Sequence, residues 1–430
     1  MILHIKSLNL NITDNSKEAS VECAFLATKS NNKYIESAKS NGCRTILTPT
    51  QLLKKLNLPI KIVGITGTNG KTTTAGAIYS ILLDLGFKVA MQGTRGFFLN
   101  DERVEGKSLT TPQSLDIINH LIIASEKSCE FFVMEVSSHA IEQLRVEGLN
   151  FALKIHTNIT SDHLDYHKTL KNYIDVKNSF FEDESVKLIN KDDPLIKFNF
   201  KNSYTYAIEN ASVFKVEAYS LKDGISALIK CFEERAELHS SLVGIFNLYN
   251  LLAAISAVKI LTNKNLDEIC EMAENFGGVS GRVEKVSEEP LIFVDFAHTT
   301  DGMKKIFELF PQREITVIFG AGGDRDKTKR PLMGRIAEMF AKKIYITSDN
   351  PRSENPLHII EDILNGIENK TKVSIFLDRK EAICKAIDNL NSHEVLLILG
   401  KGDEEYQEIN GIKYPFSDSK IVTDYLKTKN

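Results

Sequence analysis

From Lys61 onward, short runs of branched apolar residues alternate with longer stretches of helical periodicity. The first runs cover residues 61–66, 131–136 and 154–159, and a helical pattern over 72–86 follows the first of them. After Gly281 the same rhythm resumes, with strand candidates at 291–295, 315–319, 343–347, 373–377 and 395–399. Alternation of this kind builds parallel sheets with helices on their faces, so we expect an α/β fold.

The chain length predicts several domains. With 430 residues, and about 150 residues per domain as a prior, there is room for about three. The small-residue stretch 277–281 separates two α/β regions and indicates a boundary. We therefore expect a small N-terminal α/β module at 1–58, a central parallel-sheet domain at 59–281 and a C-terminal Rossmann-like domain at 282–430.

Composition and patterning exclude several classes of protein. The net charge of −4 offers no counterion-releasing surface, so we expect no nucleic-acid partner. The six cysteines lack the two-residue spacing of metal clusters and redox dithiols, which favours reduced, mostly buried thiols. Residues 1–17 show no signal-peptide pattern. Apolar stretches such as 251–258 and 395–399 are far shorter than the ~20 residues that cross a bilayer. We expect a cytoplasmic protein, without membrane insertion.

The segment Gly67-Thr-Asn-Gly70-Lys71-Thr72 lies between a predicted buried strand and a predicted helix. Backbone N–H groups of such a loop, with the helix N-terminus, can hold phosphate oxygens. Lys71 would then contact the β and γ phosphates, and Thr72 would place its hydroxyl on Mg²⁺. The strict phosphate-loop pattern is not met, because Ile65 stands where its first glycine belongs. The alternative is a plain glycine-rich turn.

Two further groups of candidate ligands follow the next predicted strands. Glu135 ends one strand, and the cluster Ser161-Asp-His163-Leu-Asp165-Tyr-His167 follows another. The carboxyl ends of strands in an open α/β sheet are where ligands bind, and these side chains suit a divalent ion. Taken alone, a histidine is more often a core or surface residue, and Lys177 by itself would be a solvated helix lysine.

An ordered series of motifs, from about residue 14 to residue 407, resembles the Mur ligase family, whose members build the peptide stem of the bacterial cell wall. The segments that carry the resemblance are Gly67–Thr73, Thr110–Pro112, Glu135–His139, Thr157–Asn158, Asp162–His167, Phe246–Asn250, Gly281–Arg282 and Asp295–His298. The resemblance covers nearly the whole chain. It implies three domains, of which the first binds a UDP-sugar, the second ATP and the third an amino acid.

The resemblance implies an ATP-dependent acid–amino-acid ligase. In such enzymes the γ-phosphoryl of ATP passes to a substrate carboxylate, an amine attacks the acyl phosphate, and phosphate leaves. Lys71, Glu135, His163 and Lys177 would be catalytic. Two Mg²⁺ ions would be held by Thr72, Glu135, His163 and a carbamylated Lys177, whose modification turns a cation into an anion. The implied ATP contacts are Gly67, Thr68, Asn69, Gly70, Lys71, Thr72, Thr73, Asn158, Asn247, Arg282, Asp295 and His298. For His298, a role in capping a turn is the alternative.

The UDP-sugar end is less sharply defined. Ser16 lies in Asp14-Asn-Ser16-Lys17, which is similar to a uridine-proximal element of the family with Lys17 in place of an arginine. A simple turn is the alternative. Contacts with the pyrophosphate, sugar or peptide are implied for Thr110, Thr111, Ser137, Gln143 and Arg145.

The amino acid is implied by Asp349-Asn350-Pro351-Arg352, which resembles the signature of the branch that adds meso-diaminopimelate to UDP-N-acetylmuramoyl-L-alanyl-D-glutamate. An arginine fork suits the second carboxylate of diaminopimelate, which L-lysine lacks. Arg325 would help to hold the amino acid, and Glu404 with the Gly400 carbonyl would face its distal ammonium. Asp403 replaces a family histidine, and Thr300 a proline.

Several alternatives stay open at this point. Residues 349–352 alone could be a plain turn. The enzyme could add L-lysine, or it could resemble a folylpolyglutamate synthase. A phosphate-loop switch without ligase activity is the rival from another class. We expect the ligase, acting as a monomer.

Overall fold

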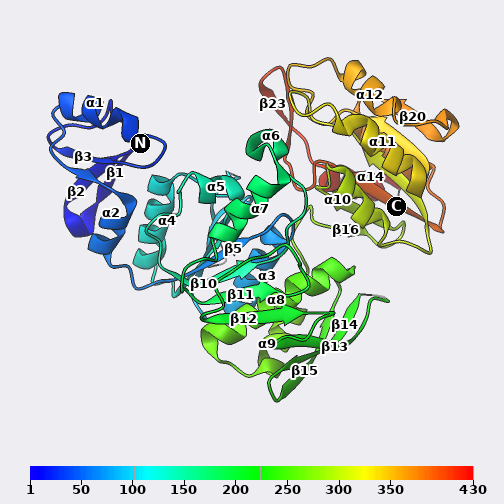
Figure 1. The fold of residues 1–430 in the computed structure, drawn as a ribbon. Helices are drawn as coiled ribbons and strands as arrows, with labels where there is room; N and C mark the ends of the chain where they lie inside the picture. The colour runs from blue at the N-terminus through cyan, green and yellow to red at the C-terminus, as the bar shows by residue number, and fades with distance from the viewer. Residues whose placement is uncertain (101, 108, 223, 430) are drawn as a thin grey trace. The chain divides into compact units, whose positions relative to one another are not determined.

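The computed structural model describes residues 1–100, 102–107, 109–222 and 224–429, without the Asp165 side chain (Figure 1). The chain forms two compact units, residues 1–277 and 278–430. The break lies inside the glycine-containing stretch 277–281 that the sequence singled out. The further boundary predicted near residue 58 stays a prediction.

The N-terminal module has its own four-stranded sheet, in the order β1-β2-β3-β4. Its elements are β1 Ile2–Ile5, β2 Leu10–Thr13, β3 Cys23–Leu26, β4 Ile46–Leu47, α1 Ile35–Ser40 and α2 Pro49–Leu56, with 3₁₀ turns at Lys6–Leu8 and Asn32–Tyr34. Thr48 and Gln51 close a capping box at the start of α2. The core of this sheet also includes Leu115 and Ile118, so the module is completed by a helix of the following region.

The central sheet has eleven strands, in the order β15-β14-β13-β12-β11-β10-β5-β9-β6-β7-β8. Its strands are β5 Lys61–Thr66, β6 Val89–Gly93, β7 Gly96–Leu99, β8 Glu102–Glu105, β9 Phe131–Glu135, β10 Phe151–His156, β11 Lys187–Asn190, β12 Ser203–Ala207, β13 Phe214–Ser220, β14 Ile225–Cys231 and β15 Glu234–Ser240. The middle pairs are parallel, but β13-β14-β15 and β6-β7-β8 pair antiparallel. The predicted parallel-sheet central domain is thus confirmed, with antiparallel strands added at both edges of the sheet.

Helices cover this sheet: α3 Lys71–Asp84, α4 Ser114–Glu126, α5 Ser138–Glu142, α6 Leu164–His167, α7 Leu170–Ser179, α8 Ile245–Thr262 and α9 Leu266–Glu274. Of the helices in the described ranges, only α8 is long and apolar enough to cross a membrane by length and composition. The apolar stretch 251–258 noted in the sequence is part of this helix. Since 61% of α8 is buried and it packs on α3, its composition suits a core helix equally well.

The second unit has a six-stranded sheet in the order β16-β17-β21-β18-β19-β20 and a two-stranded hairpin. Its strands are β16 Glu284–Ser287, β17 Ile292–Asp295, β18 Glu314–Phe319, β19 Ala341–Thr347, β20 Val373–Phe376, β21 Glu394–Leu399, β22 Tyr406–Ile409 and β23 Ile412–Pro415. Its helices are α10 Thr300–Phe307, α11 Lys329–Phe340, α12 Pro356–Leu364, α13 Arg379–Asp388 and α14 Asp418–Lys429, with a 3₁₀ turn at Lys370–Lys372. Only β16 is antiparallel in the larger sheet.

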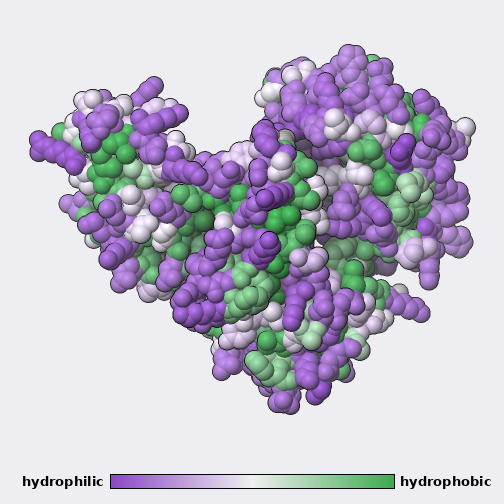
Figure 2. All heavy atoms as spheres, in the orientation of Figure 1, coloured by the Kyte–Doolittle hydropathy of each residue, from purple (hydrophilic) through white to green (hydrophobic). Residues whose placement is uncertain are grey.

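The predicted strands all form, within a few residues of their expected bounds. The largest difference is β10, which ends at His156 and leaves Thr157 and Asn158 in the loop beyond it. Five cysteines are buried, Cys384 is half-buried, and all six are free, as the cysteine spacing predicted. Figure 2 shows hydrophilic side chains over most of the visible face, with smaller hydrophobic areas between them.

Candidate functional site

The segment 67–70 joins the central strand β5 to α3 and depends on two glycines. A Cβ atom at Gly67 would lie 1.8 Å from Thr157 Oγ1, and one at Gly70 would lie 2.3 Å from Asn250 Oδ1. Gly70 also adopts a left-handed conformation, with φ of 85°, and provides no side chain to cap α3. The N-cap residue therefore offers no side-chain acceptor to the first turn of α3, and this is how a phosphate-binding helix start is built.

Thr157 and Asn158 hold this loop from the end of β10. Thr157 Oγ1 donates to Asn69 O over 2.6 Å, and Asn158 pairs with the Asn69 backbone twice, at 3.0 Å each way. Thr68 N donates to Asn158 O over 2.7 Å. Asn158, predicted as a nucleotide contact, therefore also fixes the loop.

Thr72 and Glu135 meet at the carboxyl edge of the sheet, as predicted. Thr72 Oγ1 donates to Glu135 Oε2 over 2.9 Å. Thr94, which sequence reasoning missed, donates its N–H to Glu135 Oε1 over 2.9 Å and its hydroxyl to Oε2 over 3.3 Å. A hydroxyl and a carboxylate are hard oxygen donors, so this pair fits Mg²⁺.

Lys71 folds back over the loop, where its ammonium donates to Gly67 O over 2.7 Å and to Thr68 O over 2.9 Å. Thr68 Oγ1 is bonded to Tyr173 Oη at 2.9 Å. Thr73 is buried within the first turn of α3. The contacts of Lys71 and its neighbours with phosphates stay predictions.

Lys177 is not a solvated lysine, which corrects the interpretation drawn from the residue alone. It is 1% exposed, and its Nζ donates to Thr66 Oγ1 over 3.4 Å. Burial, and then the nearby Lys71 cation, hold the pKa of Lys177 well below its ordinary value, although Asp162 acts the other way. A neutral buried amine is the form that reacts with CO₂, so this site fits carbamylation.

His163 lies at the start of α6 in a left-handed conformation, with φ of 52°. Its ring is half exposed, 3.6 Å from Asp162 and 5.1 Å, between centroids, from the ring of His139. Among the described residues no hydrogen bond or ion pair joins His163 to Glu135 or Lys177. Nor do the described residues hold a group of three or more His, Cys, Asp or Glu side chains suited to a metal. Among the four predicted metal ligands, only Glu135 and His163 are of these residue types.

The second half of the same motif has a structural role. His167 is buried, and its Nε2 is bonded to Ser138 Oγ at 2.9 Å. The Asp165 side chain lies outside the described residues.

The predicted sugar-nucleotide residues Thr110 and Thr111, before α4, and Ser137, Gln143 and Arg145, after β9, form one connected group. Thr111 Oγ1 donates to Ser137 Oγ over 3.3 Å, and Arg145 Nη1 donates to Thr111 O over 2.7 Å. Arg145 also holds Gln143 Oε1 through two bonds of 3.0 and 2.7 Å. Thr110 is bonded to Thr94 at 3.1 Å, which links this group to Glu135.

The other two predicted contacts of the first unit are Ser16 and Asn247. Ser16 lies in a turn after β2, and its carbonyl accepts from Asn41 Nδ2 over 2.9 Å. Asn247 is buried in α8, where it donates to Val243 O over 2.9 Å and accepts from Asn250 over 3.2 Å.

Arg282, Asp295 and His298 belong to the second unit. Asp295 is buried and accepts from Val283 N over 2.8 Å and Ala297 N over 2.6 Å. Burial raises its pKa, against the lowering effect of Arg282. Arg282 lies over the Phe296 ring at 4.7 Å, and His298 Nδ1 donates to Phe296 O over 2.9 Å. His298 thus makes the turn contact that was its alternative interpretation.

The predicted amino-acid residues come together at the carboxyl ends of β18, β19 and β21. Asn350 Nδ2 donates to Glu404 Oε2 over 2.8 Å, and a Cβ on Gly400 would lie 2.7 Å from Asp349 Oδ2. Arg352, left-handed with φ of 51°, donates to Gly323 O over 2.7 Å. Arg325 is exposed in the adjoining loop.

Three charged residues missed by sequence reasoning hold this cluster. Lys401 is fully buried, and its Nζ donates to Glu404 Oε2 over 2.7 Å and Asn350 Oδ1 over 3.0 Å. Glu408 Oε2 lies 3.4 Å from Arg352 Nε. Arg330, also fully buried, binds Glu354 through two bonds of 3.0 and 2.9 Å. The available sequence signal for these roles is a charged residue within an otherwise apolar or small-residue stretch.

A glycine-dependent phosphate loop at the start of α3, with a hydroxyl and a carboxylate beside it, defines a phosphate-loop α/β enzyme. The chain belongs to the Mur ligase family of ATP-dependent acid–amino-acid ligases. The profile described as "Mur ligase middle domain" matches residues 65–258, and that described as "Mur ligase, glutamate ligase domain" matches residues 281–402.

Curated relatives share one name. The chain is 58% identical, over 415 residues, to the UDP-N-acetylmuramoyl-L-alanyl-D-glutamate--2,6-diaminopimelate ligase of Wolinella succinogenes, with 96% of each chain covered. It is 51% identical to the ligase of the same name from Helicobacter pylori, over 96% of this chain and 95% of the relative. A solved structure of a ligase of this name aligns with a TM-score of 0.69 and 27% identity, covering 97% of this chain and 94% of that one.

Proposed function

We propose that this enzyme adds meso-diaminopimelate to UDP-N-acetylmuramoyl-L-alanyl-D-glutamate, with ATP and Mg²⁺, in the synthesis of the peptidoglycan precursor. The observation that carries the choice of amino acid is the cluster at residues 349–352. Arg352 donates to Gly323 O, Gly323 N donates to Asn350 O, and the Asn350 side chain donates to Glu404, so the guanidinium and the carboxylate belong to one hydrogen-bonded group. A cation and an anion suit the distal carboxylate and ammonium of diaminopimelate, whereas L-lysine offers only the ammonium.

The reaction joins two anions before it forms an amide. The substrate carboxylate attacks the γ-phosphorus of ATP, the bond to the β–γ bridging oxygen breaks, and ADP leaves with that electron pair. The amine then attacks the acyl phosphate carbon, and inorganic phosphate leaves while the amine loses its extra proton. The N–H groups of the phosphate loop and the Lys71 ammonium lower the repulsion between carboxylate and triphosphate.

Metal ligands are proposed from the same residues. Thr72 and Glu135 would hold one Mg²⁺ ion, and Glu135, His163 and a carbamylated Lys177 a second; bound there, the ions would neutralise phosphate and carboxylate oxygens. Carbamylation itself is simple chemistry for a neutral amine. The Lys177 nitrogen forms a bond to the carbon of CO₂ and releases a proton, which leaves an anion.

Binding of the UDP-sugar substrate is proposed for the group around Thr111 and Arg145. Its hydroxyls and guanidinium can donate to a diphosphate or a carboxylate. Ser16 would contact the uridine end. Because several modules take part, we expect the domains to close on their substrates during turnover.

The test is phosphate release from ATP in the presence of UDP-N-acetylmuramoyl-L-alanyl-D-glutamate. We expect release that requires this acceptor and meso-diaminopimelate together, and little with L-lysine. Release with L-lysine instead would overturn the specificity and leave the ligase. Release with a folate acceptor and glutamate, or slow hydrolysis indifferent to any acceptor, would replace the proposed function by one of its rivals.

A further inference from the structure

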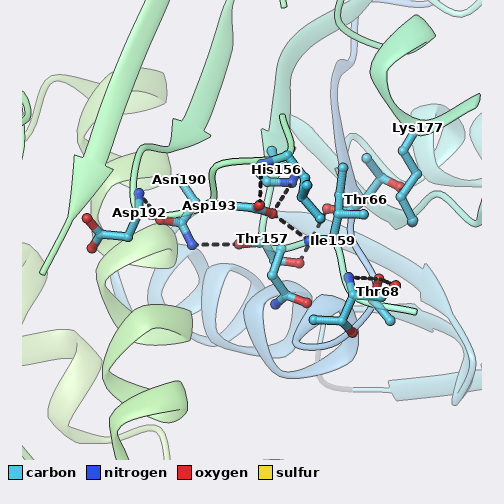
Figure 3. Close-up of polar contacts among 12 residues, drawn as sticks. Thr66, Thr68, His156, Thr157, Ile159, Lys177, Asn190, Asp192 and Asp193 are labelled. Carbon is cyan, nitrogen blue, oxygen red and sulfur yellow. Dashed lines mark hydrogen bonds and ion pairs between the residues drawn. The ribbon is translucent and has the colours of Figure 1, made fainter. Parts of the chain in front are cut away.

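Three polar residues lie at the carboxyl end of β11, next to β10 in the sheet: Asn190 ends the strand, and Asp192 and Asp193 are in the turn that follows. Figure 3 shows Asn190, Asp192 and Asp193 beside the segment that carries His156, Thr157 and Ile159. Asn190 is buried, and the Asp193 side chain is 6% exposed. None of these residues was singled out from the sequence, and none contacts the phosphate loop itself.

Asp193 holds both ends of a four-residue segment. Its Oδ2 accepts from Ile159 N over 2.5 Å and lies 3.3 Å from Nε2 of the fully buried His156. Its Oδ1 accepts from Leu195 N over 2.9 Å, which fixes the carboxylate in the turn. A buried carboxylate with these partners constrains both flanks of Thr157 and Asn158.

Asn190 holds the middle of the same segment. Its Nδ2 donates to Thr157 O over 2.7 Å, and its Oδ1 accepts from Asp192 N over 3.0 Å. The orientation of this amide is unambiguous, because a carbonyl oxygen can only accept.

The held segment in turn holds the phosphate loop. Thr157 Oγ1 and Asn158 make the bonds to Asn69 described above, and Thr157 Oγ1 is the atom that a Cβ at Gly67 would meet. Displacement of Thr157 would therefore be transmitted directly to the loop.

Asp192 connects the turn to α8. Its Oδ2 accepts from Tyr249 Oη and from Ile208 N, each over 2.7 Å. Tyr249 precedes Asn250, whose Oδ1 faces Gly70. The end of β11 thus supports the phosphate loop by two routes, one through Thr157 and Asn158 and the other through α8.

We propose that Asn190 and Asp193 are positioning residues for the triphosphate: they fix residues 156–159, which fix Gly67, Thr68 and Asn69. The inference rests on the proposed function in one respect, namely that this loop binds ATP. A misplacement of about 1 Å can cost about 10²-fold in rate, so the two side chains affect nucleotide use without touching the nucleotide.

The test uses Asn190→Asp, which keeps the shape but replaces the donor by an acceptor, and Asp193→Asn, which removes the charge. We expect the KM for ATP to rise by about tenfold or more, with the KM values of the other two substrates within about twofold. We also expect the affinity of the full chain for the Mg²⁺ complex of a non-hydrolysable ATP analogue to fall in parallel. Calorimetry without the other two substrates measures this affinity.

The matched control is Asp183→Asn in the same unit. Asp183 pairs with Lys154 at 2.5 Å, and Lys154 lies on β10 away from the loop. This variant loses an ion pair and keeps its ATP affinity. Circular dichroism and thermal unfolding identify the folded variants.

A folded Asn190→Asp or Asp193→Asn protein with wild-type ATP affinity would overturn the proposal. So would an equal rise in all three KM values, which is what a merely structural role produces. If the wild type binds the nucleotide but adds no amino acid, the proposed function fails while calorimetry still decides the positioning role. If the wild type binds no nucleotide, both fail.

Discussion

The proposed nucleotide site of the first unit and the proposed amino-acid site of the second are built from different chemical groups. Around the phosphate loop the contacts come mainly from backbone groups, hydroxyls and two lysines, Lys71 and the buried Lys177, whose pKa is lowered by burial; the carboxylate beside them, Glu135, is the proposed metal ligand. Around residues 349–352 they come from paired charges, Lys401 with Glu404, Arg352 with Glu408 and Arg330 with Glu354.

The difference matches the two proposed ligands. A polyanion such as a triphosphate needs donors that are already oriented and carry no anion of their own. A zwitterion needs fixed charges of both signs, each compensated until the ligand arrives. Loss of a side chain from the first site should therefore abolish turnover. Loss of one from the second site should leave its charged partner unpaired.

The largest effect is expected for Lys177→Ala. If a carbamate supplies an anion to the metal site, we expect turnover to fall by about 10²–10³-fold, as when one charge-stabilising group is removed. Added formate or acetate, which restores a carboxylate, should recover part of the activity in phosphate-release assays. Lys171→Ala, an exposed lysine on the same helix, is the control and keeps full activity. Wild-type turnover in Lys177→Ala would contradict a carbamate at the metal site and, with it, the proposed difference between the two sites.

A smaller effect is expected for Arg352→Ala. A hydrogen bond to a charged group contributes about 1.5–3 kcal/mol, so the KM for meso-diaminopimelate should rise roughly 10–100-fold. The KM for ATP should stay constant, and discrimination against L-lysine should shrink. Steady-state kinetics with both amino acids measure this, with the exposed Arg313→Ala as control. Unchanged discrimination would remove Arg352 from the specificity site.

The smallest effect is a pH dependence of the second unit. The hydrogen bonds from Arg330 lower the pKa of Glu354 from 4.5 to about 2. Because the folded-state pKa lies below the unfolded one, the stabilisation is complete above about pH 4.5 and is lost as the pH falls towards 2.

Glu354→Gln should therefore lower the melting temperature at neutral pH and flatten its dependence on pH between those values. Thermal unfolding over that range measures it, and Glu361→Gln, an exposed residue of α12, should behave as wild type. An equally steep acid destabilisation in Glu354→Gln would contradict the paired-charge description of this unit.

Local sequence patterns sufficed for the buried parallel strands at the centre of both sheets and for the phosphate loop. Branched apolar runs between helical stretches marked β5, β9, β18 and β21, because buried parallel strands consist of little else. Gly67 and Gly70 marked a loop too closely packed for side chains.

What was missed depends on contacts between distant segments. Thr94 meets Glu135 across 41 positions, and Lys401 meets Asn350 across 51, and no local pattern encodes such pairs. Burial of Lys177 follows from the packing of α7, where Tyr173 one turn earlier is also buried. The antiparallel strands were not predicted, although an alternation of apolar and polar residues could have indicated them. Buried positions alternate with more exposed ones along Ile225–Cys231.

A crystal structure with Mg²⁺ and a non-hydrolysable ATP analogue tests the central claim most directly. The account predicts the triphosphate on the N–H groups of residues 67–73, with Lys71 beside it, a metal on Thr72 and Glu135, and carbamate density on Lys177. A triphosphate bound away from Lys71 and Glu135 would contradict it.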